Sequence, residues 1–236
     1  MDKNNYFKFE LTLLFKAKKL RQTMIFCAYQ ILLSYLIIQG DIIHSDMCRI
    51  IYFPLLIAAP GGACIQYISR IHAQYISRQG NNSLSLRTII NKKYYLYCLL
   101  SLIVTALLLP MLARGVSLFD LITYYFTGIG PVLFLSFQMS RWDKKRMNLN
   151  ESFLKDSGIN NAKQVLIGLA YYTLFILLVL AASFFLESDE LHLCILLFSL
   201  AFVITHRLWL PPLADYYMKN KYHLIDDTNI NQKTNI

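Results

Sequence analysis

The chain has 236 residues, of which 56% are hydrophobic and 16% charged, with a mean hydropathy of +0.42 and a formal net charge of +9. The apolar share is above that of ordinary soluble domains and the charged share is below it. A water-soluble fold of this length has no room to bury so much apolar surface. A nucleic-acid-binding protein is not indicated either, because the basic residues lie between apolar blocks instead of gathering on one face or tail.

Residues 1–22 are charged and amphipathic. Phe7, Leu11, Leu14 and Phe15 recur at the spacing of one helical face, and the lysines lie elsewhere on the helix. The pattern predicts an interfacial helix on the anionic inner leaflet of a membrane. A plain basic anchor that sets the orientation of the first span explains the same charges.

Six apolar blocks follow, each about as long as a helix needs to cross the hydrocarbon layer. They cover residues 24–39, 50–69, 94–113, 116–139, 164–186 and 191–210. Backbone groups in lipid must be satisfied within their own segment, and the strict alternation of a β-barrel strand is absent from these blocks. We therefore expect an all-α polytopic membrane protein, with six transmembrane helices within residues 23–212 and a partly disordered cytoplasmic tail over 213–236.

The orientation follows from the lysines and arginines between the blocks, since positive charge is retained on the cytoplasmic side. With an even number of spans, 21 of the 23 basic residues fall on one side, and only Arg49 and Arg114 fall on the other. This split predicts a multi-pass protein of the bacterial inner membrane with both termini in the cytoplasm.

Helix-breaking residues interrupt the second and fourth blocks, where proline removes a backbone hydrogen bond and glycine lowers helix propensity. We interpret them as candidate mobile breaks in helices that line a path, and close helix packing is the alternative explanation. These residues are Pro54, Pro60, Gly61, Gly62, Gly128, Gly130 and Pro131.

Ionisable residues are almost missing from the blocks, and Asp120, His192 and His206 lie near block ends, where interfacial water can solvate them. No motif for catalysis, cofactor binding, metal binding or a phosphate loop occurs. An enzyme is therefore not expected, and a membrane-embedded enzyme acting on lipid is the weakest hypothesis. Aromatic residues expected to form an inner anchoring belt are Tyr94, Tyr95, Trp142, Trp209, Tyr216 and Tyr217.

Two cytoplasmic connections, residues 70–93 and 140–163, are long enough to act in water. In the first, Ser83 can cap a short helix that runs to Ile90, which makes this loop a candidate docking surface. The second carries a basic strip suited to lipid headgroups or a partner. Topology alone explains both strips without any partner.

This layout resembles the membrane subunits of exporter-class (type-2) ABC transporters, with an amphipathic entry helix, six spans and a helical loop after the second span. The strings Lys92–Leu96, Asp143–Asn150 and Ala162–Gly168 are similar to those of a poorly characterised bacterial family of permease-like proteins. The resemblance covers about residues 50–222. Members of that family are about twice as long, which implies a half-size subunit that forms a homodimer or a heterodimer with another permease subunit.

The resemblance implies a permease-like subunit of an ABC-type export system, in contact with membrane lipid and coupled to a separate ATP-binding subunit. The residues on which it places the ATPase-coupling loop are Arg78, Ser83, Leu86, Arg87, Ile90, Lys92 and Lys93. The competing hypothesis is a non-transporting scaffold, assembly or immunity protein that docks partners through its basic loops. Neither hypothesis involves nucleic acid.

Overall fold

The computed structural model describes residue 12 and residues 18–39, 46–65, 83–142 and 162–219. These residues are helical apart from short turns and contain no β-strand, so the all-α prediction is confirmed for them. Two 3₁₀-helices (η1, η3) and one π-helix (η2) lie among the α-helices. The elements are α2 (Lys18–Gln39), α3 (Asp46–Ile65), α5 (Ser83–Leu107), η1 (Leu109–Arg114), α6 (Leu118–Thr127), η2 (Gly128–Val132), α7 (Leu133–Met139), η3 (Ser140–Trp142), α8 (Ala162–Ser183), α9 (Ser188–Ile204) and α10 (His206–Lys219).

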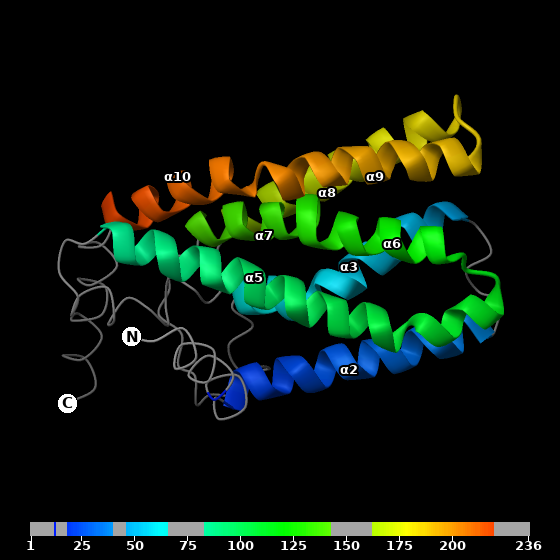
Figure 1. Ribbon diagram of the computed structural model, residues 1–236, viewed down its shortest axis with the longest axis horizontal. Coiled ribbons are helices and arrows are strands. Elements are labelled where there is room, and N and C mark those ends of the chain that lie inside the picture. Colours follow the sequence, from blue (N-terminus) through cyan, green and yellow to red (C-terminus); the bar gives the residue numbers. More distant parts are fainter. Residues whose placement is uncertain (1–11, 13–17, 40–45, 66–82, 143–161, 220–236) are drawn as a thin grey trace.

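The helices lie along one long axis, with α6 and α7 running through the middle of the bundle (Figure 1). α3 packs on both α5 and α6, α9 packs along α6, and α10 packs along the first half of α5. We call the end that holds α10 and the start of α5 the α10 end, and the end that holds η1 and the start of α6 the η1 end.

Buried side chains form two clusters, one toward each end of the bundle. The cluster at the α10 end contains Ile90, Tyr94, Phe137 and Leu213, from α5, α7 and α10. The other cluster draws Phe53, Val104, Tyr124 and Leu191 from α3, α5, α6 and α9, together with neighbours from α2 and α8. Packing of several helices around each cluster therefore holds the described elements in one bundle.

Two helices, Arg87–Ala113 and Leu118–Met139, are long and apolar enough to cross a membrane. The consecutive helices Ser188–Ile204 and His206–Tyr217, bent by 52° at their junction, would provide a third span if they form one broken crossing. Shorter apolar helices run over Met24–Leu36, Cys48–Gly61 and Leu169–Ser183.

The outward faces of the bundle carry large apolar side chains. Leu166, Phe185 and Leu208 are 69%, 86% and 73% exposed, and the exposed faces of α2, α5 and α9 are leucine- and isoleucine-rich as well. Contiguous apolar surface of this kind is uncommon on a monomeric soluble protein.

Two predicted boundaries differ from the structure. The short helix expected between Ser83 and Ile90 is not separate, because α5 continues from Ser83 to Leu107 without a break. The tail expected from residue 213 begins later, because α10 continues to Lys219 and buries Leu213 and Tyr217 against α5 and α7. In both cases the helix extends beyond its apolar block, before residue 94 for α5 and after residue 210 for α10, because tertiary packing stabilises the added turns.

Several predictions fall on residues outside the described ranges. They include most of the expected entry helix over 1–22, the end of the second block over 66–69 and the first connection over 70–82. Residues 143–161 of the second connection and residues 220–236 of the tail also lie outside the described ranges.

Candidate functional site

The predicted break in the second block is not an interruption of secondary structure. α3 runs as one helix through Pro54 and Pro60, both of which are buried. A proline within a helix costs one backbone hydrogen bond, and packing on neighbouring helices can compensate for this loss. Mobility of α3 at these prolines stays a prediction.

The predicted break in the fourth block coincides with an irregular segment. Gly128–Val132 forms one turn of π-helix between α6 and α7, and all five residues are buried. A Cβ atom built on Gly130 would lie 2.7 Å from the carbonyl oxygen of Ser199 in α9, closer than real Cβ contacts. Thr127 and Ser199 also lie in contact, with their hydroxyl oxygens 3.0 Å apart. Glycine is therefore required here by the close approach of α9.

The residues assigned to the coupling loop have different environments. Arg78 lies outside the described residues, and for Ser83 and Leu86 the structure describes the backbone of the first turn of α5. Arg87 forms a bidentate ion pair with Asp215 of α10, with Nη2 2.9 and 2.8 Å from the two carboxylate oxygens. The remaining positions are Ile90 and Lys93, which are buried, and Lys92, which is half-buried.

One face of α5 therefore belongs to the bundle core and not to an independent loop. Burial of Lys93, which is 1% exposed, was not expected, because a lysine next to an apolar block is usually a solvated flank. The expectation that this whole segment is a free docking surface is wrong for Ile90 and Lys93. Their positions on the same face as Tyr94 and Tyr97 explain why, since residues three and four apart share one side of a helix.

α5 also contacts both sets of predicted helix breaks. The hydroxyl group of Tyr94 donates a hydrogen bond to the carbonyl oxygen of Ile129 in the π-helix, at 3.3 Å. The Cβ atom of Tyr97 lies 3.0 Å from the position that a Cβ on Gly61 would occupy in α3. The predicted coupling segment is therefore in contact with both predicted helix breaks. Tyr94 and Tyr97, which lie one helical turn apart on α5, make these contacts.

The aromatic residues near the α10 end form a packed cluster. The Tyr94 ring stacks on His206 at 5.0 Å and meets Trp209 edge-on at 5.6 Å. The hydroxyl oxygen of Tyr95 lies 3.0 Å from Nε2 of His206, and Tyr217 shares a 2.6 Å hydrogen bond with Ser140. An anchoring belt exposed to the interface is therefore the wrong description of Tyr94 and Tyr217, which are buried in the protein core.

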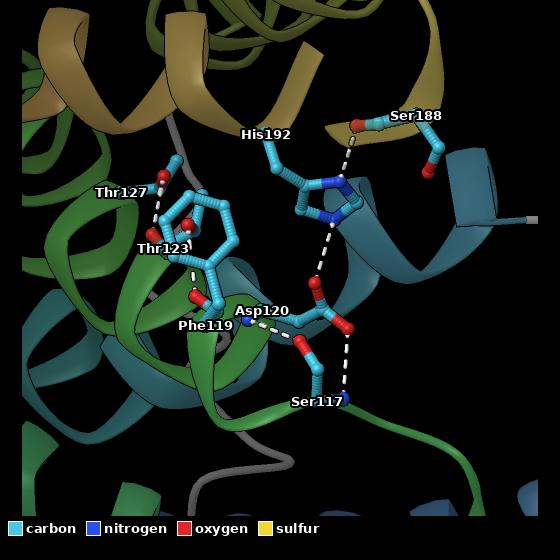
Figure 2. A network of polar contacts seen from close by, with 7 residues as sticks. All are labelled: Ser117, Phe119, Asp120, Thr123, Thr127, Ser188 and His192. Atoms are coloured by element: carbon cyan, nitrogen blue, oxygen red, sulfur yellow. Dashed lines mark hydrogen bonds and ion pairs between the residues drawn. The ribbon is translucent and has the colours of Figure 1, made fainter. Parts of the chain in front are cut away.

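A second polar group lies at the η1 end, where α6 and α9 both begin. Figure 2 shows the imidazole of His192 between the backbone carbonyl of Ser188 and the side chain of Asp120. Nδ1 of His192 lies 2.8 Å from the Ser188 oxygen, and because a carbonyl only accepts, Nδ1 carries a hydrogen. Nε2 is buried, lies 3.5 Å from Oδ1 of Asp120 and has no hydrogen-bond partner among the described residues.

The other carboxylate oxygen of Asp120 has a structural role. Oδ2 accepts a hydrogen bond from the backbone nitrogen of Ser117 at 2.9 Å, while the Ser117 hydroxyl accepts one from the backbone nitrogen of Asp120. This is a reciprocal capping box that satisfies free backbone donors at the start of α6. Asp120 therefore fixes the start of α6 and also faces His192 across the gap to α9.

The contact between Asp120 and His192 was not predicted, although a signal for it is present. Ser117 followed three residues later by Asp120, and Glu187 followed by Glu190, are both capping patterns that mark a helix start. Two neighbouring helices that begin at the same end of a bundle have their first turns side by side, which places Asp120 near His192. Interfacial solvation, the expected explanation, does not describe His192, which is 3% exposed.

Among the described residues, no group of three or more histidine, cysteine, aspartate or glutamate side chains could hold a metal ion. The cluster around His206 at the α10 end and the contact between Asp120 and His192 at the η1 end therefore have packing, helix capping and charge pairing as their visible roles.

Comparison with known proteins identifies the chain at the level of a family. No curated protein matches the sequence, and no solved structure matches the model. A family model described as a family of unknown function, DUF5687, matches residues 3–227, which is nearly the whole chain. The chain is therefore a member of the DUF5687 family.

Proposed function

We propose that this protein is a six-span permease-like subunit of an ABC-type export system, driven by a separate ATP-binding subunit. In this proposal the protein lies in the bacterial inner membrane, with both termini in the cytoplasm. A second subunit, identical or related, completes the path across the membrane.

The six apolar segments support the membrane part of the proposal. Each block predicted from the sequence overlaps one helix or a run of two or three consecutive helical elements, including the three shorter apolar helices and the bent pair α9–α10. The exposed leucine-rich faces are the surface that a helix presents to lipid. Near-absence of ionisable groups within these segments fits a protein whose energy comes from a partner.

The continuity of α5 from Ser83 to Leu107 supports the proposed coupling between an ATPase and the membrane helices. An ATPase that binds near the start of α5 would act on one end of an unbroken helix. The same helix reaches the π-helix through Tyr94 and reaches α3 through Tyr97. A displacement of the inner end of α5 would therefore be transmitted directly to the two irregular helices, without an intervening loop.

The first test is purification of the full chain from its native membrane in mild detergent, followed by identification of bound proteins. We expect an ABC-type nucleotide-binding protein to copurify, and its ATPase activity to change when the two are reconstituted together in liposomes. If no nucleotide-binding protein copurifies and no ATPase activity responds to the chain, the proposal is wrong and the scaffold or assembly hypothesis takes its place.

A charge-reversal variant tests the role of α5. Lys92→Glu changes a half-buried residue of the proposed coupling segment, and we expect it to reduce the stimulated ATPase activity severalfold while the chain remains folded. Asp189→Lys is the matched control, because Asp189 is exposed at the opposite end of the bundle, on α9. Equal activities of the two variants would contradict coupling through α5.

A further inference from the structure

A groove with a volume of about 590 Å³ lies between α7 and α8, near the point where α7 ends. Its apolar wall includes Phe134 and Met139 from α7 and Ala170 and Leu174 from α8. Polar side chains line it as well, namely Gln138, Arg141 and Tyr171. The groove therefore combines hydrocarbon-like surface with donors of hydrogen bonds, as binding sites for amphiphilic molecules do.

Arg141 is held in place by α10. Its guanidinium carbon lies 5.4 Å from the centre of the Tyr216 ring, and the Tyr216 hydroxyl donates a 3.1 Å hydrogen bond to the Arg141 carbonyl. A guanidinium ion stacked on an aromatic ring has few rotamers left to lose when it binds an anion.

One hydrogen-bond donor of Arg141 has no partner in the described part of the protein. Its Nε atom is buried and has no hydrogen-bond partner, and no carboxylate of the described residues lies within ion-pair distance of it. The acidic residue of the neighbouring helix, Asp215, is engaged by Arg87. A buried donor of a charged group without a partner costs free energy, and an anionic ligand would remove this cost.

The charged group of the groove lies apart from its apolar end along the helix axis. Arg141 lies seven residues after Phe134, which corresponds to about 10 Å along a helix. On the antiparallel neighbour α8, Leu174 lies one turn beyond Ala170 toward the apolar end. A molecule with an anionic group at Arg141 would therefore place an attached hydrocarbon chain against Phe134, Ala170 and Leu174.

We propose that this groove binds one anionic phospholipid, with its phosphate at Arg141 and one acyl chain along the apolar wall. The planar guanidinium fits phosphate geometry, and the Gln138 amide and Tyr171 hydroxyl supply further donors for the headgroup. The proposal requires a membrane location but not an ATPase partner, so it goes beyond the proposed transport function. Loss of lipid binding and loss of ATPase coupling are separate experimental results.

The test is native mass spectrometry of the full chain released from mixed vesicles of phosphatidylglycerol and phosphatidylcholine. We expect one phosphatidylglycerol molecule to be retained in clear preference to phosphatidylcholine. Arg141→Gln should reduce this preference about tenfold, because a charge-assisted hydrogen bond to phosphate is lost. Arg141→Lys should restore part of the preference, since the charge returns without the bidentate geometry.

Two further variants separate the groove from general surface charge. Ala170→Trp fills the apolar wall and should remove the retained lipid while Arg141 remains. Arg207→Gln, which removes an exposed arginine of α10 outside the groove, should leave retention unchanged. Retention by both Arg141→Gln and Ala170→Trp at the wild-type level would overturn the proposal, as would equal retention of the two lipids. Equally tight binding of glycerol phosphate would also overturn it, because the acyl chain would then contribute nothing.

Discussion

The role of Asp120 in the structure differs from the role that its position in the sequence predicts. From the sequence it is a charge near a block end, where water is an adequate partner. In the structure one of its oxygens caps α6, and the other faces a buried histidine of α9. The capping pattern was readable from Ser117 and Asp120 alone, but the partner 72 positions later was not, because pairing across helices depends on how the helices are packed.

Asp120→Asn tests the charge without removing the cap. The asparagine oxygen can still accept from the Ser117 backbone, whereas the charge opposite His192 is lost. We expect the free energy of unfolding in detergent to fall by about 1–2 kcal/mol, as for loss of a partly buried polar contact. Thermal unfolding followed by tyrosine and tryptophan fluorescence measures this change.

His192→Gln in the wild-type and Asp120→Asn backgrounds isolates the pairwise contribution. The two changes should be less than additive, by about 0.5–1 kcal/mol. Asp189→Asn is the control, because this carboxylate is exposed on the first turn of the same helix. Strict additivity, or an equal loss of stability in the control, would show that Asp120 stabilises α6 only as a cap.

At the scale of the elements, the length of a helix is less predictable than its presence. The six apolar blocks locate the helices because the period and the length of apolar runs are local properties of the sequence. By contrast, the residue at which α5 begins and the residue at which α10 ends depend on the packing of these two helices against each other. Ile90 and Lys93 on one helix and Leu213 and Tyr217 on the other are buried because these two helix ends pack together.

The approach of α9 to the π-helix can be tested with two glycine substitutions. Gly130→Ala places a methyl group 2.7 Å from a backbone oxygen of Ser199, which cannot rotate away. We expect a loss of about 1–3 kcal/mol in stability, typical of overpacking. Gly128→Ala is the matched control, because its methyl group would lie 3.1 Å from the Pro54 oxygen and needs a smaller shift.

Thermal unfolding of both variants in one detergent gives the comparison. The Gly130 variant should unfold at the lower temperature, and the ATPase coupling proposed above should weaken in the same order. Identical midpoints for the two variants would contradict the close helix approach.

At the scale of the whole molecule, the predicted orientation depends on charge counts that the fold itself does not test. The structure brings Gly115, with φ of +84°, to a tight turn between η1 and α6 at the η1 end. Ser83 and Lys219 begin α5 and end α10 at the opposite end of the bundle. In a six-span protein these two ends lie on opposite sides of the membrane.

Epitope tags give a direct measurement of this arrangement. A tag inserted after Gly115 should be labelled from outside intact spheroplasts, and a tag after Ile236 should be labelled only after the membrane is opened. The reason is that, with six spans, 21 of the 23 basic residues fall on one side, which the positive-inside rule predicts to be the cytoplasmic side. Labelling of both tags from the same side would reject three spans between Gly115 and Ile236, and with them the six-span arrangement. A tag on a soluble cytoplasmic protein controls for leakage.

The π-helix also has a consequence for how this chain tolerates insertions and deletions. A π-turn holds one residue more than an α-turn over nearly the same rise, so it amounts to a single residue inserted into a continuous helix. Because the wider turn absorbs the extra residue, removing one residue from Gly128–Val132 would restore an α-turn and leave the face that α7 presents nearly unchanged. Removing one residue from the regular first turn of α7 would instead rotate the rest of that helix by about 100°. Phe137 would then leave the core, and Arg141 would leave the groove, although neither residue had been changed. The π-turn is therefore the place in this span where the loss of one residue disturbs the packing of α7 on α8 and α10 least.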